Sequence, residues 1–192
     1  TATAKRGTGT DVNILLASPA QVNDNIEVRI YYHGTAATSS GLNPNGAGFF
    51  TSATNVFSAS PPYNSSTWWP CKQNLADKAD SSWFFITTDT SNTAISNGSL
   101  SRTVDVSNTK KRWEWKSRYP IDFYLICFTV GKYKKTIKYF HPTGRTDSMV
   151  VEYYGTSQPI TLGVLQKYSE LFGLYPFYEE KYALALVTLG GG

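Results

Sequence analysis

Alternating hydrophobic and polar positions dominate the sequence and predict β-strands. In residues 25–34, NIEVRIYYHG, the apolar residues Ile26, Val28 and Ile30 alternate with charged ones, which is the period of a half-buried strand. Similar patterns recur in RWEWKSR (112–118) and SMVVEYY (148–154), and the continuous apolar run FYLICFTVGKY (123–133) suits a central strand. Turn sequences separate these segments, at NPNGAG (43–48), SNGS (96–99) and HPTGRTD (141–147). The pattern predicts an antiparallel β architecture.

One segment has the periodicity of a helix instead. Apolar residues step by four at Ile160, Val164 and Tyr168, and Leu171 and Phe172 complete the stripe. Start and stop signals flank it, with Ser157, Gln158 and Pro159 before and Gly173 and Pro176 after. The strand-like run EKYALALVTL (180–189) follows. We therefore predict a mostly β fold, an antiparallel β-sandwich or saddle-like domain followed by one helix and a short strand.

Composition and charge agree with a globular domain. The 192 residues are 41% hydrophobic and 17% charged, and the net charge is +4. Lysines cluster at 132, 134, 135 and 138 around Tyr133 and Tyr139. Such a cluster fits either a nucleic-acid face or a solvated strand edge, and we favour the edge because edge lysines discourage aggregation. We expect no nucleic-acid partner, and no membrane span, since no apolar run approaches about 18 residues.

The residues that could carry chemistry are few. The two histidines, His33 and His141, are 108 positions apart, and a zinc site needs clustered ligands. Neither an HExxH sequence nor a phosphate-binding glycine loop occurs. Cys71 and Cys127 each lie in an apolar, aromatic stretch, which favours two free core thiols over a disulfide and leaves their pairing open. The residues themselves predict no catalytic or metal site.

Four segments together resemble the aminopeptidase N-like zinc metallopeptidases. They are WWPCKQNLADKAD (68–80), AISNGSL (94–100), YPIDFYLICFTVGKY (119–133) and YPFYEEKYALALVTLGGG (175–192). The resemblance runs from about Val12 to Gly192. It implies an N-terminal β domain over residues 1–155, then the first helix and strand of a thermolysin-like catalytic domain over residues 156–192, in a segment truncated at both ends.

The resemblance also implies a function. The chain would be a non-catalytic segment that shapes the substrate cleft and supports the missing catalytic domain, inactive by itself. Zinc and a peptide substrate are expected in the full-length parent, in an extracytoplasmic location, either secreted or periplasmic. The alternative is a free-standing β-sandwich that binds glycans or a protein partner through exposed aromatic residues.

Site residues follow from the resemblance position by position. Gly191 and Gly192 match the first two positions of the family's Gly-x-Met-Glu motif, whose backbone lines the substrate like an added strand. Ala59 and Pro61 stand where many members carry Gln or Glu side chains that hold the substrate amino terminus. These substitutions leave open whether the parent is an active or a diverged peptidase.

A further departure lies beside the Trp-Trp pair. Ser66 and Gln73 replace an Arg and an Asp of the family. Because both charges are missing together, we infer a lost ion pair between these two positions.

Overall fold

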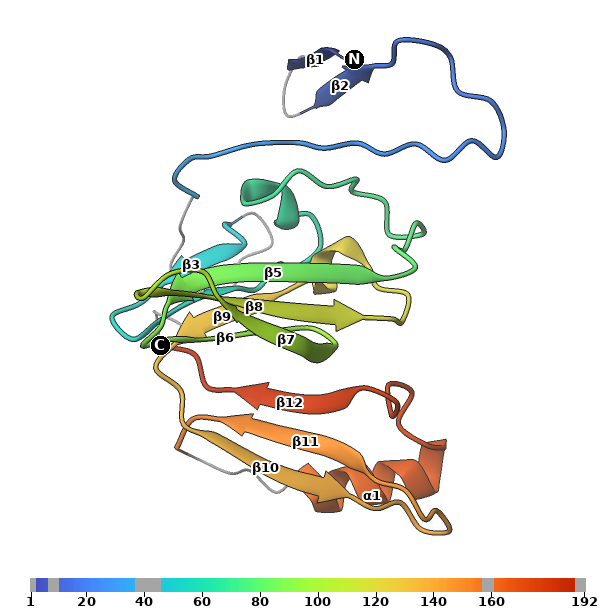
Figure 1. Cartoon of the computed structure of the whole chain (residues 1–192). Helices are drawn as coiled ribbons and strands as arrows, with labels where there is room; N and C mark the ends of the chain where they lie inside the picture. Colours follow the sequence, from blue (N-terminus) through green and yellow to red (C-terminus); the bar gives the residue numbers. More distant parts are fainter. Residues whose placement is uncertain (1–2, 7–10, 37–45, 157–160, 189–192) are drawn as a thin grey trace. The chain divides into compact units, whose positions relative to one another are not determined.

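The computed structural model describes residues 3–6, 11–36, 46–156 and 161–188 (Figure 1). The chain divides into two compact units, Thr1–Gly34 and Thr35–Gly192. In the first unit, β1 (Thr3–Arg6) pairs antiparallel with β2 (Val12–Leu15). Each unit is described here by itself.

The strand predicted at residues 26–32 is not formed. This stretch of the first unit has no regular secondary structure, and its apolar residues Ile26, Val28 and Ile30 are exposed. Alternation favours an extended chain, but a strand also needs a neighbour to pair its backbone groups. Among the described residues of the first unit, β1 and β2 pair only with each other.

The second unit contains two antiparallel sheets. One has the order β3-β4-β9-β6, with strands Phe49–Thr51, Asn55–Ser58, Phe128–Gly131 and Thr93–Ser96. The other has the order β5-β8-β7, with strands Ser82–Asp89, Lys110–Ser117 and Ser99–Asp105. Trp115 of β8 and Ile95 of β6 are buried in one hydrophobic cluster, so the two sheets contact each other through side chains.

The strand predicted at residues 112–118 is confirmed as part of β8, with one difference in its burial. Trp115 is buried as the alternation predicts, but the neighbouring Glu114 is also buried. Arg102 and Arg112 donate hydrogen bonds to its carboxylate at 2.7 and 2.8 Å. The Arg102 guanidinium, with help from Arg112, lowers the pKa of Glu114. Two arginines therefore cover the face of β8 that the pattern assigns to solvent.

The predicted central strand is shorter than its apolar run. Residues Phe123–Leu125 form a 3₁₀ turn, and only Phe128–Gly131 form β9, which does lie between β4 and β6. The predicted turns at SNGS and HPTGRTD are confirmed, and both contain a glycine with positive φ, Gly98 and Gly144.

A third sheet has the order β10-β11-β12, with strands Lys135–Phe140, Met149–Tyr154 and Lys181–Ala185. The helix α1 (Thr161–Phe172) and the short strand β12 are confirmed. β12 pairs with β11 in parallel, a pairing that the strand pattern does not specify. A parallel pair needs a crossover connection, and α1 provides it.

The apolar stripe predicted for α1 faces outward. Leu165 packs on Met149 and Val151 of β11, whereas Tyr168 is 61% and Phe172 80% exposed; Ile160 lies outside the described residues. Tyr154, also on β11, belongs to the cluster around Trp115. The third sheet thus has α1 on one face and the sandwich on the other (Figure 1).

Two further predictions concern edges and boundaries. Lys135 and Lys138 lie on β10, at the edge of the third sheet, as the edge interpretation predicts. The domain boundary at residues 155 and 156 stays a prediction. In the part of the chain that the structure describes, no helix has the length and apolar character to cross a membrane.

Candidate functional site

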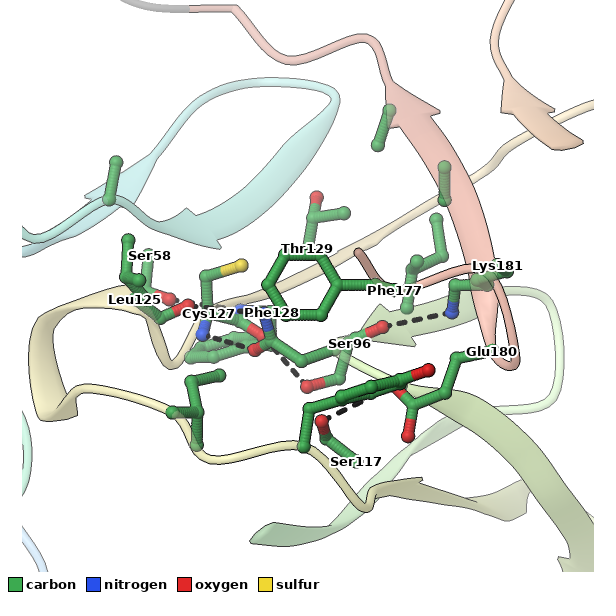
Figure 2. Close-up of a pocket in the computed structure, with 18 of the residues that line it drawn as sticks. Ser58, Ser96, Ser117, Leu125, Cys127, Phe128, Thr129, Phe177, Glu180 and Lys181 are labelled. Carbon is green, nitrogen blue, oxygen red and sulfur yellow. Dashed lines mark hydrogen bonds between the residues drawn. The ribbon is translucent and has the colours of Figure 1, made fainter. Parts of the chain in front are cut away.

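Three of the four segments of the family resemblance, AISNGSL, YPIDFYLICFTVGKY and YPFYEEKYALALVTLGGG, contribute to a pocket of about 480 Å³ in the second unit (Figure 2). The segment WWPCKQNLADKAD is not among the described lining residues. Its walls are mostly aromatic and aliphatic, from Phe57, Ile95, Leu125, Phe128, Phe177 and Val187. Concave apolar sites of this size with a few polar groups are the usual form of small-molecule sites. The pocket is therefore the candidate functional site.

The turn after β6 builds one wall. Ser96 Oγ donates a hydrogen bond to the carbonyl oxygen of Cys127 at 2.7 Å, and the Cys127 amide donates to Asn97 Oδ1 at 2.8 Å. Asn97 Nδ2 donates to the Leu125 carbonyl at 3.1 Å. These bonds join AISNGSL to the YLICF stretch, so two motifs that are distant in sequence form one wall.

The segment before β12 builds the opposite wall. Glu180 accepts a hydrogen bond from the Arg118 amide at 2.6 Å and one from Ser117 Oγ at 3.3 Å. The ring of Phe177 stands edge-on to that of Tyr119, with centroids 5.2 Å apart. Residues 177–180 are thereby fixed against the chain that leaves β8.

Lys181, the first residue of β12, places a buried amine at the pocket. Its side chain is only 8% exposed, and Nζ donates a hydrogen bond to the Ser96 carbonyl at 3.1 Å (Figure 2). Nζ also lies 3.6 Å from the centroid of the Trp115 ring. Burial lowers the pKa of Lys181 to about 8, although the nearby Glu152 carboxylate opposes this shift.

Glu152 of β11 balances part of this charge. It is buried, its Oε1 lies 2.6 Å from Lys135 Nζ, and its Oε2 lies 3.9 Å from Lys181 Nζ. Tyr154 donates a hydrogen bond to Glu152 Oε2 at 2.8 Å, and burial together with this carboxylate raises the pKa of Tyr154. Glu152 is thus shared among three groups, with Lys135 nearer than Lys181.

The lowered pKa of Lys181 predicts a stability that rises in mild alkali. The lysine pKa is about 10.4 in an unfolded chain and about 8 in the folded one. Between these values the unfolded chain binds more protons, so the free energy of unfolding increases with pH. For this one group we expect a gain of about 1 kcal/mol between pH 7 and pH 9.

Urea unfolding of the wild type and of Lys181→Met at both pH values checks this. The free energy of unfolding of the wild type, relative to that of Lys181→Met, should increase by about 1 kcal/mol from pH 7 to pH 9. The raised pKa values of Cys71 and Cys127 act in the opposite direction. The contribution of Cys71 is common to both proteins and cancels. Lys181 lowers the pKa of Cys127, so its removal raises that pKa further and changes the difference between the two proteins in the same direction as Lys181 itself. A constant difference would contradict a neutralised Lys181.

The predicted site residues fall in different places. Ala59 lines the pocket, just after β4. Pro61 is half-buried and is not among the described lining residues. Gly191 and Gly192 lie outside the described residues.

The inferred lost ion pair has a neutral counterpart. Gln73 Nε2 donates to Ser66 Oγ at 2.7 Å, so the two positions are in contact, as that hypothesis requires. A hydrogen bond between uncharged side chains stands where the family would place the pair.

The described residues do not fit a zinc site. Over residues 3–6, 11–36, 46–156 and 161–188, no three His, Cys, Asp or Glu side chains are grouped to hold a metal. Cys71 and Cys127 are free thiols, as the sequence favours, but both are half-buried and not part of the core. Burial raises the pKa of both, that of Cys71 to about 11, which keeps them protonated and poor zinc ligands.

No protein-family model matches the chain, and a search of curated proteins gave no match. The M1 zinc metallopeptidase from Deinococcus radiodurans superposes with a TM-score of 0.80 at 21% identity, over 97% of this chain and 43% of that one. The chain has the fold of the matching part of this M1 zinc metallopeptidase.

Two more structures agree with this M1 fold. A mutant of the Deinococcus radiodurans enzyme bound to a Tyr-Ser-Ala substrate gives a TM-score of 0.81 at 23% identity, over 97% of this chain and 44% of that one. Legionella pneumophila aminopeptidase A, in complex with aspartic acid, gives 0.61 at 14% identity, over 73% of this chain and 18% of that one. The chain therefore spans less than half the length of these enzymes.

Sequence reasoning missed the most unusual group of the site. Lys181 lies in the segment EKYALALVTL (180–189). Next to Glu180, it has the pattern of an ordinary exposed charged residue at the start of a strand. Only the parallel pairing of β12 with β11 carries it under Trp115. A local pattern holds no signal for such burial.

Proposed function

We propose that this chain is a non-catalytic part of an aminopeptidase N-like zinc metallopeptidase, in which it forms a wall of the substrate cleft and supports the catalytic domain. The observation that carries the proposal is the match over 97% of the chain to a peptidase bound to Tyr-Ser-Ala. Peptide is accordingly the proposed substrate of the parent and zinc its proposed metal. An extracytoplasmic location stays a prediction.

The outward stripe of α1 supports the need for a covering domain. Val164, Tyr168, Leu171 and Phe172 are 48 to 80% exposed along a 12-residue helix. A helix buries its apolar stripe against a neighbour in a stable domain, and contiguous exposed apolar residues mark interaction surfaces. The catalytic domain of the parent is the proposed neighbour.

The pocket supports a role in the cleft. Ala59, at a position that the resemblance assigns to amino-terminus binding, lines it together with aromatic side chains. Alanine offers no hydrogen bond, so we expect weak recognition of a substrate amino terminus. The alternative of a free-standing glycan-binding module is not favoured by the comparisons.

The test uses the full-length parent with Ala59→Gln. If position 59 faces the substrate amino terminus, a new hydrogen bond to a charged group should lower KM for aminoacyl anilides roughly tenfold. Ala53→Gln, on the exposed β3–β4 turn, is the matched control and should leave KM unchanged. A full-length protein that neither binds zinc nor hydrolyses these substrates would contradict the proposal.

A further inference from the structure

The pocket has the composition of a reactive-amine site. Lys181 is the one cationic side chain among its described lining residues, in walls that are largely apolar. Its side chain is almost completely removed from solvent. A desolvated lysine in an apolar pocket is the arrangement that proteins use for Schiff-base chemistry.

The neighbouring charges leave this amine weakly stabilised as an ammonium ion. Glu152 lies 2.6 Å from Lys135 but 3.9 Å from Lys181, so its negative charge belongs mainly to Lys135. Glu180, the carboxylate among the described lining residues of the pocket, already accepts hydrogen bonds from the Arg118 amide and Ser117. Burial, helped by the positive charge of Lys135, therefore outweighs the two carboxylates and lowers the pKa of Lys181, which favours a neutral amine more than at a solvated lysine.

The surroundings of Nζ also direct its lone pair. The Ser96 carbonyl at 3.1 Å requires an N–H pointing toward it. The face of the Trp115 ring, 3.6 Å from Nζ, is electronegative and disfavours a lone pair on that side. The lone pair of a neutral Lys181 is therefore best accommodated toward the cavity.

We propose that the pocket binds apolar aldehydes and that Lys181 captures them as an imine. The amine attacks the carbonyl carbon, and a proton passes from nitrogen to the carbonyl oxygen to give a carbinolamine. Loss of water then forms the C=N bond. The reaction consumes one amine and one aldehyde, releases one water, and needs no oxidant or reductant.

The probe is 2-hydroxy-1-naphthaldehyde, whose imines absorb visible light. After incubation with the chain, borohydride reduction fixes the C–N bond for peptide mass spectrometry. We expect one adduct per chain, at Lys181, with a rate that rises through pH 8. At pH 7.5 the neutral fraction of Lys181 should exceed that of a solvated lysine by roughly a hundredfold.

Two variants make the result specific. Lys181→Arg keeps the positive charge but cannot form the imine, so its adduct should fall to background while circular dichroism stays native. Lys167→Met removes a lysine on α1 with a 66% exposed side chain and should leave the adduct unchanged. If Lys181→Arg misfolds, protection of the wild-type Lys181 by the unreactive 2-naphthol provides the same evidence.

Three results would overturn the proposal. They are labelling spread over surface lysines, an adduct that survives in Lys181→Arg, and a lack of protection by 2-naphthol. The experiment needs neither zinc nor peptidase activity, so its outcome is independent of the proposed function.

Discussion

Gly98→Ala should unfold the protein or lower its free energy of unfolding by roughly 4 kcal/mol or more, because two separate penalties add. Gly98 has φ of +75° in the turn between β6 and β7, a conformation unfavourable for alanine. An added Cβ would lie 2.0 Å from the Lys116 carbonyl oxygen and 2.3 Å from its carbonyl carbon. These are backbone atoms of β8 and cannot rotate away. Urea unfolding followed by tryptophan fluorescence measures the loss.

Gly144→Ala is the matched control. Gly144 also has positive φ, +81°, but a Cβ there would meet no atom within 4 Å. The substitution should cost only the backbone preference, about 1 kcal/mol. If both substitutions lower the free energy of unfolding equally, the contact with the Lys116 backbone contributes nothing, and the β6–β7 turn is not packed on β8 as described.

Trp115→Ala should lower the free energy of unfolding by about 3–5 kcal/mol. Trp115 is 1% exposed and lies in the cluster that joins the sheets. Its indole nitrogen donates to the Ala94 carbonyl at 3.0 Å, and its ring faces Lys181 Nζ. Truncation therefore opens a cavity, leaves a buried carbonyl without its donor, and removes a partner of the buried amine. Urea unfolding at pH 7 measures the effect.

Trp83→Ala tests whether burial, and not residue type, sets this cost. Trp83 is on β5, 52% exposed, with Lys116 Nζ 4.1 Å from its ring centroid. Loss of that exposed cation–π contact should cost about 0.5–1 kcal/mol. A Trp83 variant as unstable as the Trp115 variant would mean that the outer face of β5 is covered in solution.

Gly98→Ala and Trp115→Ala probe the same structural feature. Gly98 and Trp115 both hold β8 against the β6 strand and its turn, and this turn forms the pocket wall that contains Ser96 and Asn97. A loss of packing there should also abolish aldehyde capture by Lys181. The stability and labelling experiments therefore report on one site.

Elements governed by local chemistry could be predicted from the sequence. The strands at residues 112–117 and 149–154, the helix at 161–172 and the turn at 96–99 match their patterns. Alternation, capping residues and glycine act over a few residues, so the local sequence is sufficient to specify these strands, the helix and the turn. The four motif segments likewise predicted an M1-type fold, which the structural matches support.

The tertiary structure alone decided which surfaces are covered. Residues 26–32 alternate like a strand but lack a described pairing partner in their unit, and α1 packs through Leu165 instead of its longer apolar stripe. Lys181 becomes a buried amine only because β12 lies parallel to β11, which brings it beneath Trp115 and beside Glu152. Pairing and burial depend on residues tens of positions away, and a local pattern contains no information about such contacts.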